Sequence, residues 1–300
     1  MFRGLGARNG ERMPIDSLCV PIEDRGFLLG DAVYETFRTY EGRLFALEDH
    51  LDRLEASLSA VRIRDAPDRR TISRWLEGTT EEAWRTLHAE KERVADELVV
   101  RVTVTRGPGP RGFSPVGAGP AQVYILARPL PPAAERVYTE GLSTVTAKVR
   151  RVPVEAQDPA IKAGSALNLV LARLEADDQG ADEALLTDAR GDYLEASGAN
   201  LFALKDGVFW SPRAGDGILE GVTMRRLVAI LEADGWKGER RAVPPDVLFS
   251  ADEVLLTQTT REVMPVSRID GRAIGTGRPG PESARLRARF REEVRRWRLA

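Results

Sequence analysis

The chain has 300 residues, with 44 basic and 46 acidic side chains and a formal net charge of −2. This length can bury a sizeable core, and the balanced charge gives no indication of nucleic-acid binding. Cys19 is the only cysteine, and His50 and His88 lie far apart, which excludes an intrachain disulfide and predicts no metal site. Because there is no apolar run of 18 residues and no signal-peptide pattern, we expect a cytoplasmic protein without a membrane partner.

The first half of the chain predicts two helices followed by two strands. Apolar residues recur at three- and four-residue steps over 47–61 and over 72–87, which is typical of amphipathic helices. The segments 97–105 and 121–127 are rich in β-branched and apolar residues, so we expect two paired strands. Three prolines follow within four positions, and proline cannot continue a helix or a central strand. We therefore predict an N-terminal α/β domain over 1–127 and an interdomain linker over 128–135.

The second half predicts a C-terminal domain over 136–300 in which strands alternate with helices. The expected strands lie at about 142–149, 184–187, 201–204 and 253–257, and the expected helices at about 165–177 and 223–234. Near the end of the chain, one helical stripe is formed by Leu286, Phe290, Val294 and Trp297. A last helix should therefore pack on the body of the domain. The fold class expected from these patterns is α+β, in two unequal domains.

Lys162 stands out because lysine is rare here: the chain has five lysines and 39 arginines. Its neighbours are Ile161, Ala163 and Gly164, and a helix-like apolar pattern follows. A partly buried amine loses its proton more easily and can attack a carbonyl carbon to form a Schiff base, which arginine cannot do. The alternative is a lysine at a helix start whose charged end reaches solvent.

The sequence Gly107-Pro-Gly-Pro-Arg-Gly112 has the spacing of a dinucleotide-binding loop, but we predict no such site. That loop must open a helix whose N-terminus holds the pyrophosphate, whereas further prolines and glycines follow here. We expect a loop that presents Arg106 and Arg111, with a solvent-facing hairpin as the alternative.

Glu195 follows a turn and precedes the strand expected at 201–204. A carboxylate can hold the nitrogen of a pyridine cofactor protonated, so that the ring accepts electrons, although a carboxylate at a turn is more often simply solvated. Ser197 lies nearby but is not part of a GxSxG sequence and has no histidine near it in the chain, so a serine hydrolase has little support.

Val222 and Thr223 open an expected helix and could bind a phosphate. Free backbone N–H groups, a hydroxyl and the helix dipole favour an anion there, and the alternative is that Thr223 is an ordinary N-cap. The hydroxyls in 257–260, at the end of a strand, could contribute further bonds. Arg53 could add a charge-assisted bond, although on its own it would be a surface arginine.

Together these features describe a pyridoxal-phosphate site, and the chain resembles the class IV aminotransferase family. That family includes D-amino-acid aminotransferases, branched-chain aminotransferases, (R)-amine transaminases and 4-amino-4-deoxychorismate lyase. The matching stretches follow the family's order along the chain and are 24–36, 50–54, 161–162 with 167–168, 195–202, 218–223 and 259–266.

The resemblance implies the two-domain class IV fold, with a smaller α/β N-terminal domain, a larger C-terminal domain and the cofactor, pyridoxal 5'-phosphate (PLP), between them. Lys162 would be the Schiff-base lysine and proton shuttle, and Glu195 the partner of the pyridine nitrogen. The expected phosphate-binding residues are Arg53, Val222, Thr223 and Thr259. The resemblance also implies a homodimer in which N-terminal loops of one subunit close the neighbour's site.

The substrates implied are an amino donor (a D-amino acid, a branched-chain L-amino acid or an (R)-amine) and a 2-oxo acid. Arg111 aligns with the arginine that binds the substrate carboxylate in the D-amino-acid enzymes, and Tyr34 with a tyrosine that assists it. Thr36 and Thr260 complete the expected substrate contacts. Phe113 stands where the D-amino-acid enzymes carry a histidine, which weakens a D-alanine interpretation.

Other interpretations of substrate and class stay open. The segment 100–103 lacks the Tyr-x-Arg motif of common branched-chain enzymes. Thr36 and the loop 106–113 also resemble the lyase, which releases pyruvate and 4-aminobenzoate from 4-amino-4-deoxychorismate. A third possibility is a non-catalytic dimeric binding protein on the same fold. The presence of both Lys162 and Glu195 argues against it.

Overall fold

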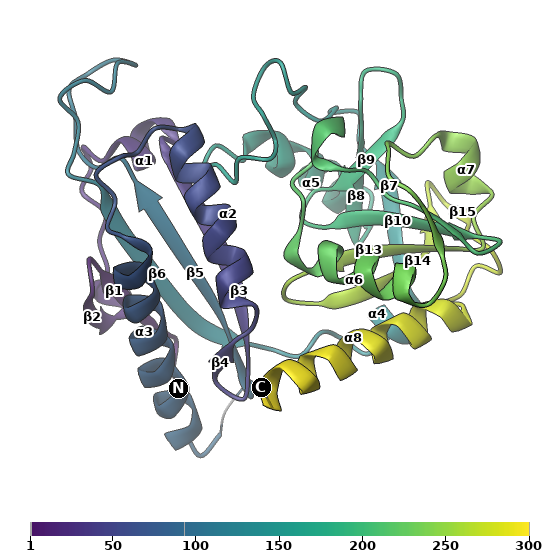
Figure 1. Cartoon of the computed structure of the whole chain (residues 1–300), viewed down its shortest axis with the longest axis horizontal. Coiled ribbons are helices and arrows are strands. Elements are labelled where there is room, and N and C mark those ends of the chain that lie inside the picture. Colours follow the sequence, from purple (N-terminus) through teal and green to yellow (C-terminus); the bar gives the residue numbers. More distant parts are fainter. Residues whose placement is uncertain (1, 93, 300) are drawn as a thin grey trace. The chain divides into compact units, whose positions relative to one another are not determined.

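The computed structural model describes residues 2–92 and 94–299 (Figure 1). The chain forms two compact units: unit 1 consists of Met1–Pro132 and Ile161–Ser165, and unit 2 of Ala133–Ala160 and Ala166–Ala300. Each unit combines a sheet with helices, which confirms the predicted α+β class.

Unit 1 is built on a six-stranded antiparallel sheet with the strand order β2-β1-β6-β5-β3-β4. Its strands are β1 (Leu5–Arg8), β2 (Glu11–Pro14), β3 (Ala32–Tyr40), β4 (Arg43–Leu44), β5 (Glu97–Thr105) and β6 (Gln122–Leu130). Its helices are α1 (Arg25–Leu29), α2 (Leu47–Ala60), α3 (Arg69–Ala89) and the short 3-10 helix η1 (Ile15–Ser17).

Helices α2 and α3 cover one face of this sheet (Figure 1). Alternate residues of β5, from Leu98 to Val104, are fully buried in the core beneath them, as the period of two in a half-covered strand requires. The opposite face carries half-buried side chains, among them Tyr34, Thr36 and Arg101. The predicted helices over 47–61 and 72–87 and the strand over 97–105 are therefore confirmed.

Strand β6 continues to Leu130, three residues into the segment predicted as a linker. Pro129 pairs with Leu98 of β5, whereas the pairing with β1 ends at Ala127. Beyond Ala127, no strand pairs with β6 on its β1 side, so no backbone N–H is needed there for a hydrogen bond. A proline, which lacks this N–H, is therefore tolerated at position 129. The expectation that the prolines stop the strand at residue 127 was wrong for this reason.

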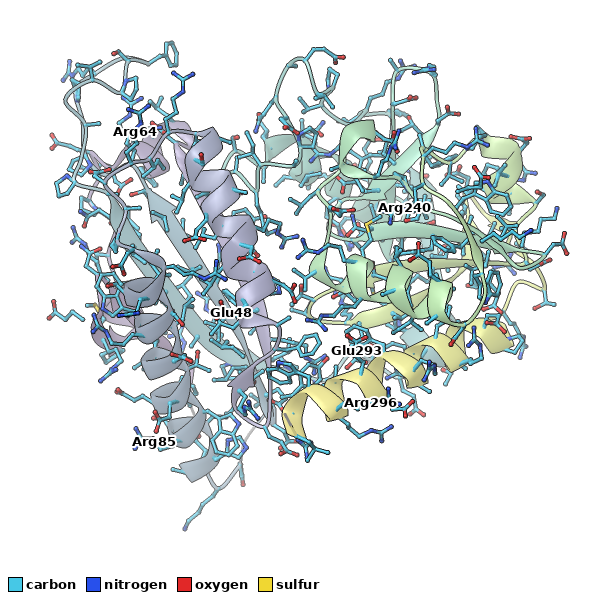
Figure 2. The ribbon with its side chains drawn as sticks, in the orientation of Figure 1. Glu48, Arg64, Arg85, Arg240, Glu293 and Arg296 are labelled. Carbon is cyan, nitrogen blue, oxygen red and sulfur yellow. The ribbon has the colours of Figure 1, made fainter. Side chains whose placement is uncertain are left out.

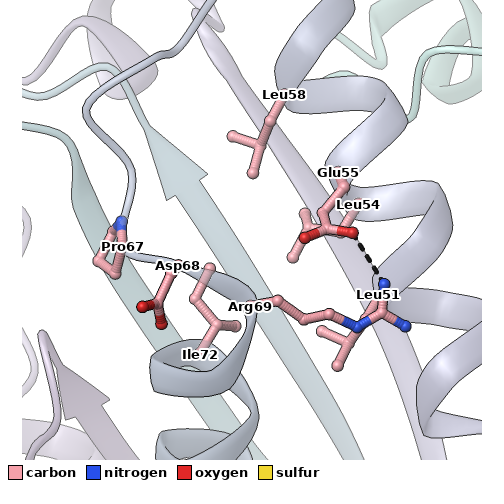
Figure 3. A pocket seen from close by; sticks show the side chains of 8 residues that line it. All are labelled: Leu51, Leu54, Glu55, Leu58, Pro67, Asp68, Arg69 and Ile72. Atoms are coloured by element: carbon pink, nitrogen blue, oxygen red, sulfur yellow. Dashed lines mark hydrogen bonds and ion pairs between the residues drawn. The ribbon is translucent and has the colours of Figure 1, made fainter.

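A small cavity of about 200 Å³ lies between the first turn of α3 and helix α2 (Figure 3). Its floor is apolar, with Leu51, Leu54 and Ile72 among the lining residues. On its rim Arg69 contacts three carboxylates of α2, including that of Glu55 at 2.8 Å. No predicted site residue lines this cavity, so we interpret it as part of the helix packing.

The segment Ile161–Ser165 joins the sheet of unit 1 although it is distant in sequence. It adds to the part of β3 that β4 leaves uncovered, with Ala163 bridged to Val33. The amide of Tyr34 donates to the carbonyl of Lys162 at 3.0 Å, and the amide of Gly164 to the carbonyl of Ala32 at 2.7 Å. The segment falls within the predicted C-terminal domain over 136–300, whereas the structure groups it with the N-terminal sheet.

Unit 2 contains a nine-stranded mixed sheet. Its strands are β7 (Leu142–Thr146), β8 (Glu183–Thr187), β9 (Tyr193–Ala196), β10 (Asn200–Lys205), β11 (Val208–Trp210), β12 (Lys237–Glu239), β13 (Glu253–Gln258), β14 (Glu262–Ile269) and β15 (Arg272–Ala273). Its helices are α4 (Arg136–Thr139), α5 (Leu167–Asp178), the 3-10 helix η2 (Ala214–Asp216), α6 (Val222–Ala233), α7 (Pro245–Phe249) and α8 (Pro281–Leu299).

Six strands of unit 2 close on themselves in the order β10-β13-β14-β7-β8-β9. The closing pair joins Glu195 of β9 to Asn200 of β10. A predicted site residue thus lies where the ring closes, and a closed sheet holds its side chains on a rigid frame.

The expected helices and strands of unit 2 are confirmed, with one strand shorter than predicted. Strand β7 ends at Thr146, because the amides of Lys148 and Val149 donate to the carboxylate of Glu175 on α5. The predicted last helix is α8, which buries Leu286, Phe290 and Val294 on one stripe.

Candidate active site

The main chain of Lys162 is fixed on both sides. Its carbonyl accepts from the amide of Tyr34 on β3 at 3.0 Å, and its amide donates to Oγ of Ser57 on α2 at 3.2 Å. Its side chain is partly buried, and its Nζ lies 4.6 Å from the centre of the Tyr34 ring. Burial lowers the pKa of Lys162, because desolvation disfavours the ammonium form. Repulsion from Arg53 and Arg101 lowers this pKa further. A larger share of Lys162 is therefore a neutral amine, able to act as nucleophile or base.

Arg101 of β5 stacks on the same tyrosine, with its Cζ 3.5 Å from the centre of the Tyr34 ring. Burial alone would raise the pKa of Tyr34, but the cations of Lys162 and Arg101 outweigh burial and lower it. Thr36 is paired with Arg101 across the two strands. The structure thus brings Tyr34, Thr36 and Lys162 together on one half-buried sheet face, and it adds Arg101, which the sequence analysis did not select.

Arg53 is held by a buried carboxylate rather than lying on the surface. Its guanidinium forms two hydrogen bonds to Glu35, from Nε at 2.7 Å and from Nη2 at 2.8 Å, and its side chain is only 11% exposed. Burial would raise the pKa of Glu35, but the hydrogen bonds from Arg53 and His50 outweigh it and lower this pKa to about 2. Burial also lowers the pKa of His50, so its neutral ring donates from Nδ1 to Glu35 at 2.8 Å.

Arg111 lies in the exposed loop between β5 and β6, and no helix follows β5, as predicted. Within residues 2–92 and 94–299, Arg111 makes no hydrogen bond or ion pair. Other arginines hold the loop: Arg25 donates to the carbonyls of Gly112 and Phe113, each at 3.0 Å. Arg106 pairs with Asp31 at 2.8 Å, which makes Arg106 a structural clamp of the loop base. Unit 1 does not bring Arg111 into contact with Tyr34 or Lys162.

In unit 2, Glu195 is buried and its carboxylate is fixed from two directions. The Nε of Arg151 donates to Oε1 at 2.6 Å, and the amide of Leu219 donates to Oε2 at 3.2 Å. The side-chain amide of Asn200 lies 3.5 Å from Oε2 and donates to the carbonyl of Leu219 at 2.7 Å. A carboxylate oriented by a charge-assisted hydrogen bond from an arginine is suited to accept a hydrogen bond from a protonated ring nitrogen. The alternative of a solvated turn carboxylate is wrong.

Helix α6 begins at Val222, with Gly221 as its N-cap. The alternative that Thr223 is the N-cap is therefore wrong. Among the described residues, no side chain caps the helix, and the N–H groups of residues 222–224 have no acceptor. A Cβ at Gly221 would lie 2.1 Å from Oδ1 of Asn200, so the turn needs glycine to approach this side chain. The result is an uncapped helix N-terminus, the geometry that binds phosphate.

Thr259 and Thr260 lie in the turn between β13 and β14, and both are half-buried. The hydroxyl of Thr260 donates to Oε1 of Gln258 at 3.0 Å, and the side-chain amide of Gln258 donates to the carbonyl of Gly198 at 2.9 Å. This turn is thus tied to the loop that follows Glu195. Unit 2 therefore positions all of its predicted site residues on connected elements around the strand pair β10 and β13.

Over residues 2–92 and 94–299, no group of three histidine, cysteine, aspartate or glutamate side chains could hold a metal ion. No helix in this described part of the chain is long and apolar enough to cross a membrane.

Comparisons with known proteins identify the family. The family profile described as amino-transferase class IV matches residues 32–269. A putative branched-chain-amino-acid aminotransferase of Methanocaldococcus jannaschii is 33% identical over 291 residues and covers 96% of both chains. A D-alanine aminotransferase of Bacillus licheniformis is 32% identical and covers 95% of each chain. The chain therefore belongs to the class IV aminotransferase family.

A solved structure agrees with this assignment. The branched-chain amino acid aminotransferase of Thermobaculum terrenum, determined in its PLP-bound form, superposes with a TM-score of 0.83 and 27% identity, covering 98% of this chain and 95% of that one. The predicted class IV fold is confirmed, and the protein is an enzyme of the transaminase type, not a non-catalytic binding protein.

Proposed function

We propose that this chain uses PLP to move an amino group from an amino acid to a 2-oxo acid, with Lys162 as the catalytic residue. The observation that carries the proposal is the half-buried, deprotonation-prone amine of Lys162, held on the β3 edge. The range of proposed donors includes D-amino acids, branched-chain L-amino acids and (R)-amines, because the relatives are both branched-chain and D-alanine aminotransferases.

The residues present fit PLP in three respects. The first-turn N–H groups of α6 and the hydroxyl of Thr223 would bind its phosphate, with Thr259 and Arg53 as further donors. The buried carboxylate of Glu195, fixed by Arg151, would accept a hydrogen bond from its ring nitrogen. Lys162 would form the covalent link to its aldehyde carbon. When bound, PLP supplies an electron-accepting ring.

Each side chain then has a definite task. Once the substrate amine has displaced it, the amine of Lys162 would take the proton from the substrate α-carbon and pass it to the cofactor within the same half-reaction, and it would carry a proton in the opposite direction in the second half-reaction. The Glu35 carboxylate orients Arg53 by two hydrogen bonds, so that the remaining donors of the guanidinium keep a fixed direction. Tyr34, Thr36, Arg111 and Thr260 are the proposed substrate contacts. Arg111 would bind the donor carboxylate from the exposed loop.

We also propose a homodimer in the cytoplasm. Helix α5 exposes four apolar side chains at helical spacing, Leu167, Val170, Leu171 and Leu174, each at least 42% exposed. Such a stripe is costly in water and favours contact with a second copy. The single cysteine, Cys19, is free and exposed, which suits a reducing compartment. Light scattering at several concentrations would test the dimer, and a monomer at all of them would refute it.

The test of the function detects the covalent link between Lys162 and PLP. Borohydride reduction of the PLP-loaded protein should label the peptide that contains Lys162, as read by mass spectrometry. Lys162→Ala should lose this label and turnover, whereas Lys237→Ala, which removes an exposed lysine of β12, should keep both. Turnover near the wild-type rate in Lys162→Ala would overturn the proposal.

A further inference from the structure

A row of arginines on α8 borders a cavity that the proposed reaction does not use. The cavity has a volume of about 280 Å³ and lies between α8, strand β14 and helix α4. Arg287, Arg291 and Arg295 line it at four-residue steps, with Tyr138 and Pro265 on the opposite side. The small side chains of α8 at positions 284 and 288 leave the space open. None of the proposed PLP-binding residues lines this cavity.

The cavity lining is positively charged: it contains three arginines and no acidic residue. One buried carboxylate lies beside it, that of Glu262, which accepts from Nε of Arg291 at 2.8 Å. The Nε of Arg287 is 3.8 Å from the same oxygen, too far for a hydrogen bond. Arg295 forms no ion pair or hydrogen bond with residues 2–92 or 94–299. A cation-rich hollow of this kind favours an anionic ligand.

Arg287 shows the imbalance most clearly. Its guanidinium stacks on Tyr138, with Cζ 3.3 Å from the ring centre, and its Nε is buried without a hydrogen-bond partner. Burial lowers the pKa of Arg287, and repulsion from Arg291 lowers it further, beyond what Tyr138 and Glu262 restore. Since an arginine stays charged in proteins, an anion that approaches these two side chains would relieve a real electrostatic cost.

The framework of the site is fixed before any ligand binds. The hydroxyl of Tyr138 donates to the carbonyl of Arg261 at 2.9 Å, which fixes the ring against the β13–β14 turn. The opposite stripe of α8 is anchored in the core by Leu286, Phe290 and Val294. Side chains four residues apart on a helix rise by about 6 Å, so one compact anion can meet donors from two successive turns. The main chain and Tyr138 therefore need no rearrangement on binding, and the ordering cost falls on the exposed arginine side chains.

We propose that this cavity is a binding site for a small doubly charged oxyanion of the phosphate type, held by Arg287, Arg291 and Arg295. The planar forks of neighbouring arginines would each donate to phosphate oxygens, and the anion would add a counter-charge beside Arg287, whose Nε has no hydrogen-bond partner. The side chain of Arg287 is 24% exposed, that of Arg291 is 50% exposed, and Arg295 is exposed. The three arginines therefore form a path for an anion from solvent into the cavity.

The experiment is calorimetric titration of inorganic phosphate into the protein saturated with PLP, so that the phosphate-binding end of α6 is filled. Succinate, a dicarboxylate, is titrated in parallel, and the site should prefer phosphate. Arg295→Gln, at an exposed position, should weaken phosphate binding about tenfold without affecting folding. Arg287→Gln should weaken it at least as much, with thermal unfolding as a check on its fold.

The matched control is Arg296→Gln. Arg296 lies on the same helix, is 70% exposed and pairs with Glu292, and it does not line the cavity (Figure 2). Its variant should bind phosphate as the wild type does. The proposal is overturned if no saturable binding occurs, if Arg295→Gln and Arg296→Gln behave alike, if succinate binds more tightly, or if Thr223→Val alone abolishes binding.

Discussion

Replacing Glu35 by glutamine tests the buried carboxylate that orients Arg53. Glu35 is fully buried and accepts from Arg53 and from His50. Its glutamine variant keeps the shape but not the charge, so the guanidinium of Arg53 remains buried beside a neutral amide. Removing one partner of a buried ion pair typically costs about 3 kcal/mol or more. At neutral pH the variant should unfold with a free energy lower by about 3 kcal/mol.

The pH dependence of unfolding gives a second value for the stabilisation by the Glu35 carboxylate. The pKa of Glu35 falls from an ordinary 4.5 to about 2 in the folded protein. The folded state therefore binds fewer protons than the unfolded chain, so this stabilisation is complete above pH 4.5 and is lost as the pH falls toward 2. At about 1.4 kcal/mol per pH unit the total is about 3 kcal/mol, of which about 2 kcal/mol is gone at pH 3.

The assay is urea unfolding of wild type and Glu35→Gln at a series of pH values from about 7 to about 3. The difference in unfolding free energy should narrow by about 2 kcal/mol over this range. Because burial lowers the pKa of His50 and Glu35 raises it, both proteins carry His50→Gln in this comparison, which removes the titration of His50. Glu81→Gln, at an exposed site on α3, is the control and should show no such trend. A difference that stays constant over the whole pH series would refute the reasoning.

Three further substitutions test the site. Arg101→Gln removes a neighbouring cation, so the pKa of the Lys162 amine should rise and the acidic limb of kcat, which reports the substrate complex, should move to higher pH; an unmoved limb would show that the stack is only structural. Arg151→Gln should weaken PLP binding about tenfold in a fluorescence titration, because Glu195 loses its charged partner, and unchanged affinity would count against that role. Thr36→Val should reduce transamination only mildly. The lyase alternative would instead be favoured if the wild type released pyruvate from 4-amino-4-deoxychorismate and the variant lost this activity severely.

Much of the fold could be predicted because periodic patterns report local burial. The alternation over 97–105 predicted β5 with both ends correct, and the leucine steps of 47–58 predicted α2. The extent of β6 could not be predicted, because whether Pro129 is tolerated depends on where β1 stops pairing. That is a property of the sheet and not of the proline.

The sequence predicts candidate site residues where a residue's chemistry is unusual in its own segment, as with Lys162 and Glu195. The partners that set the charge of these groups were missed. Arg101 and Arg151 look like ordinary surface arginines in a chain with 39 of them. Glu35 does break the apolar face of β3 shared by Val33 and Phe37, which is a usable signal. Its partners come from α2, however, and only the folded sheet identifies them.

The most direct test of the central claim is the visible spectrum of the PLP-loaded protein as a single amino donor is added without an acceptor. D-alanine, L-leucine and an (R)-arylamine would be tested separately, with Lys162→Ala as the control. We predict that at least one donor converts the pyridoxal form to the pyridoxamine form in the wild type, with release of the oxo product, and that Lys162→Ala does not respond. A wild-type spectrum unchanged by all three donors, or an equal conversion in Lys162→Ala, would contradict the assignment.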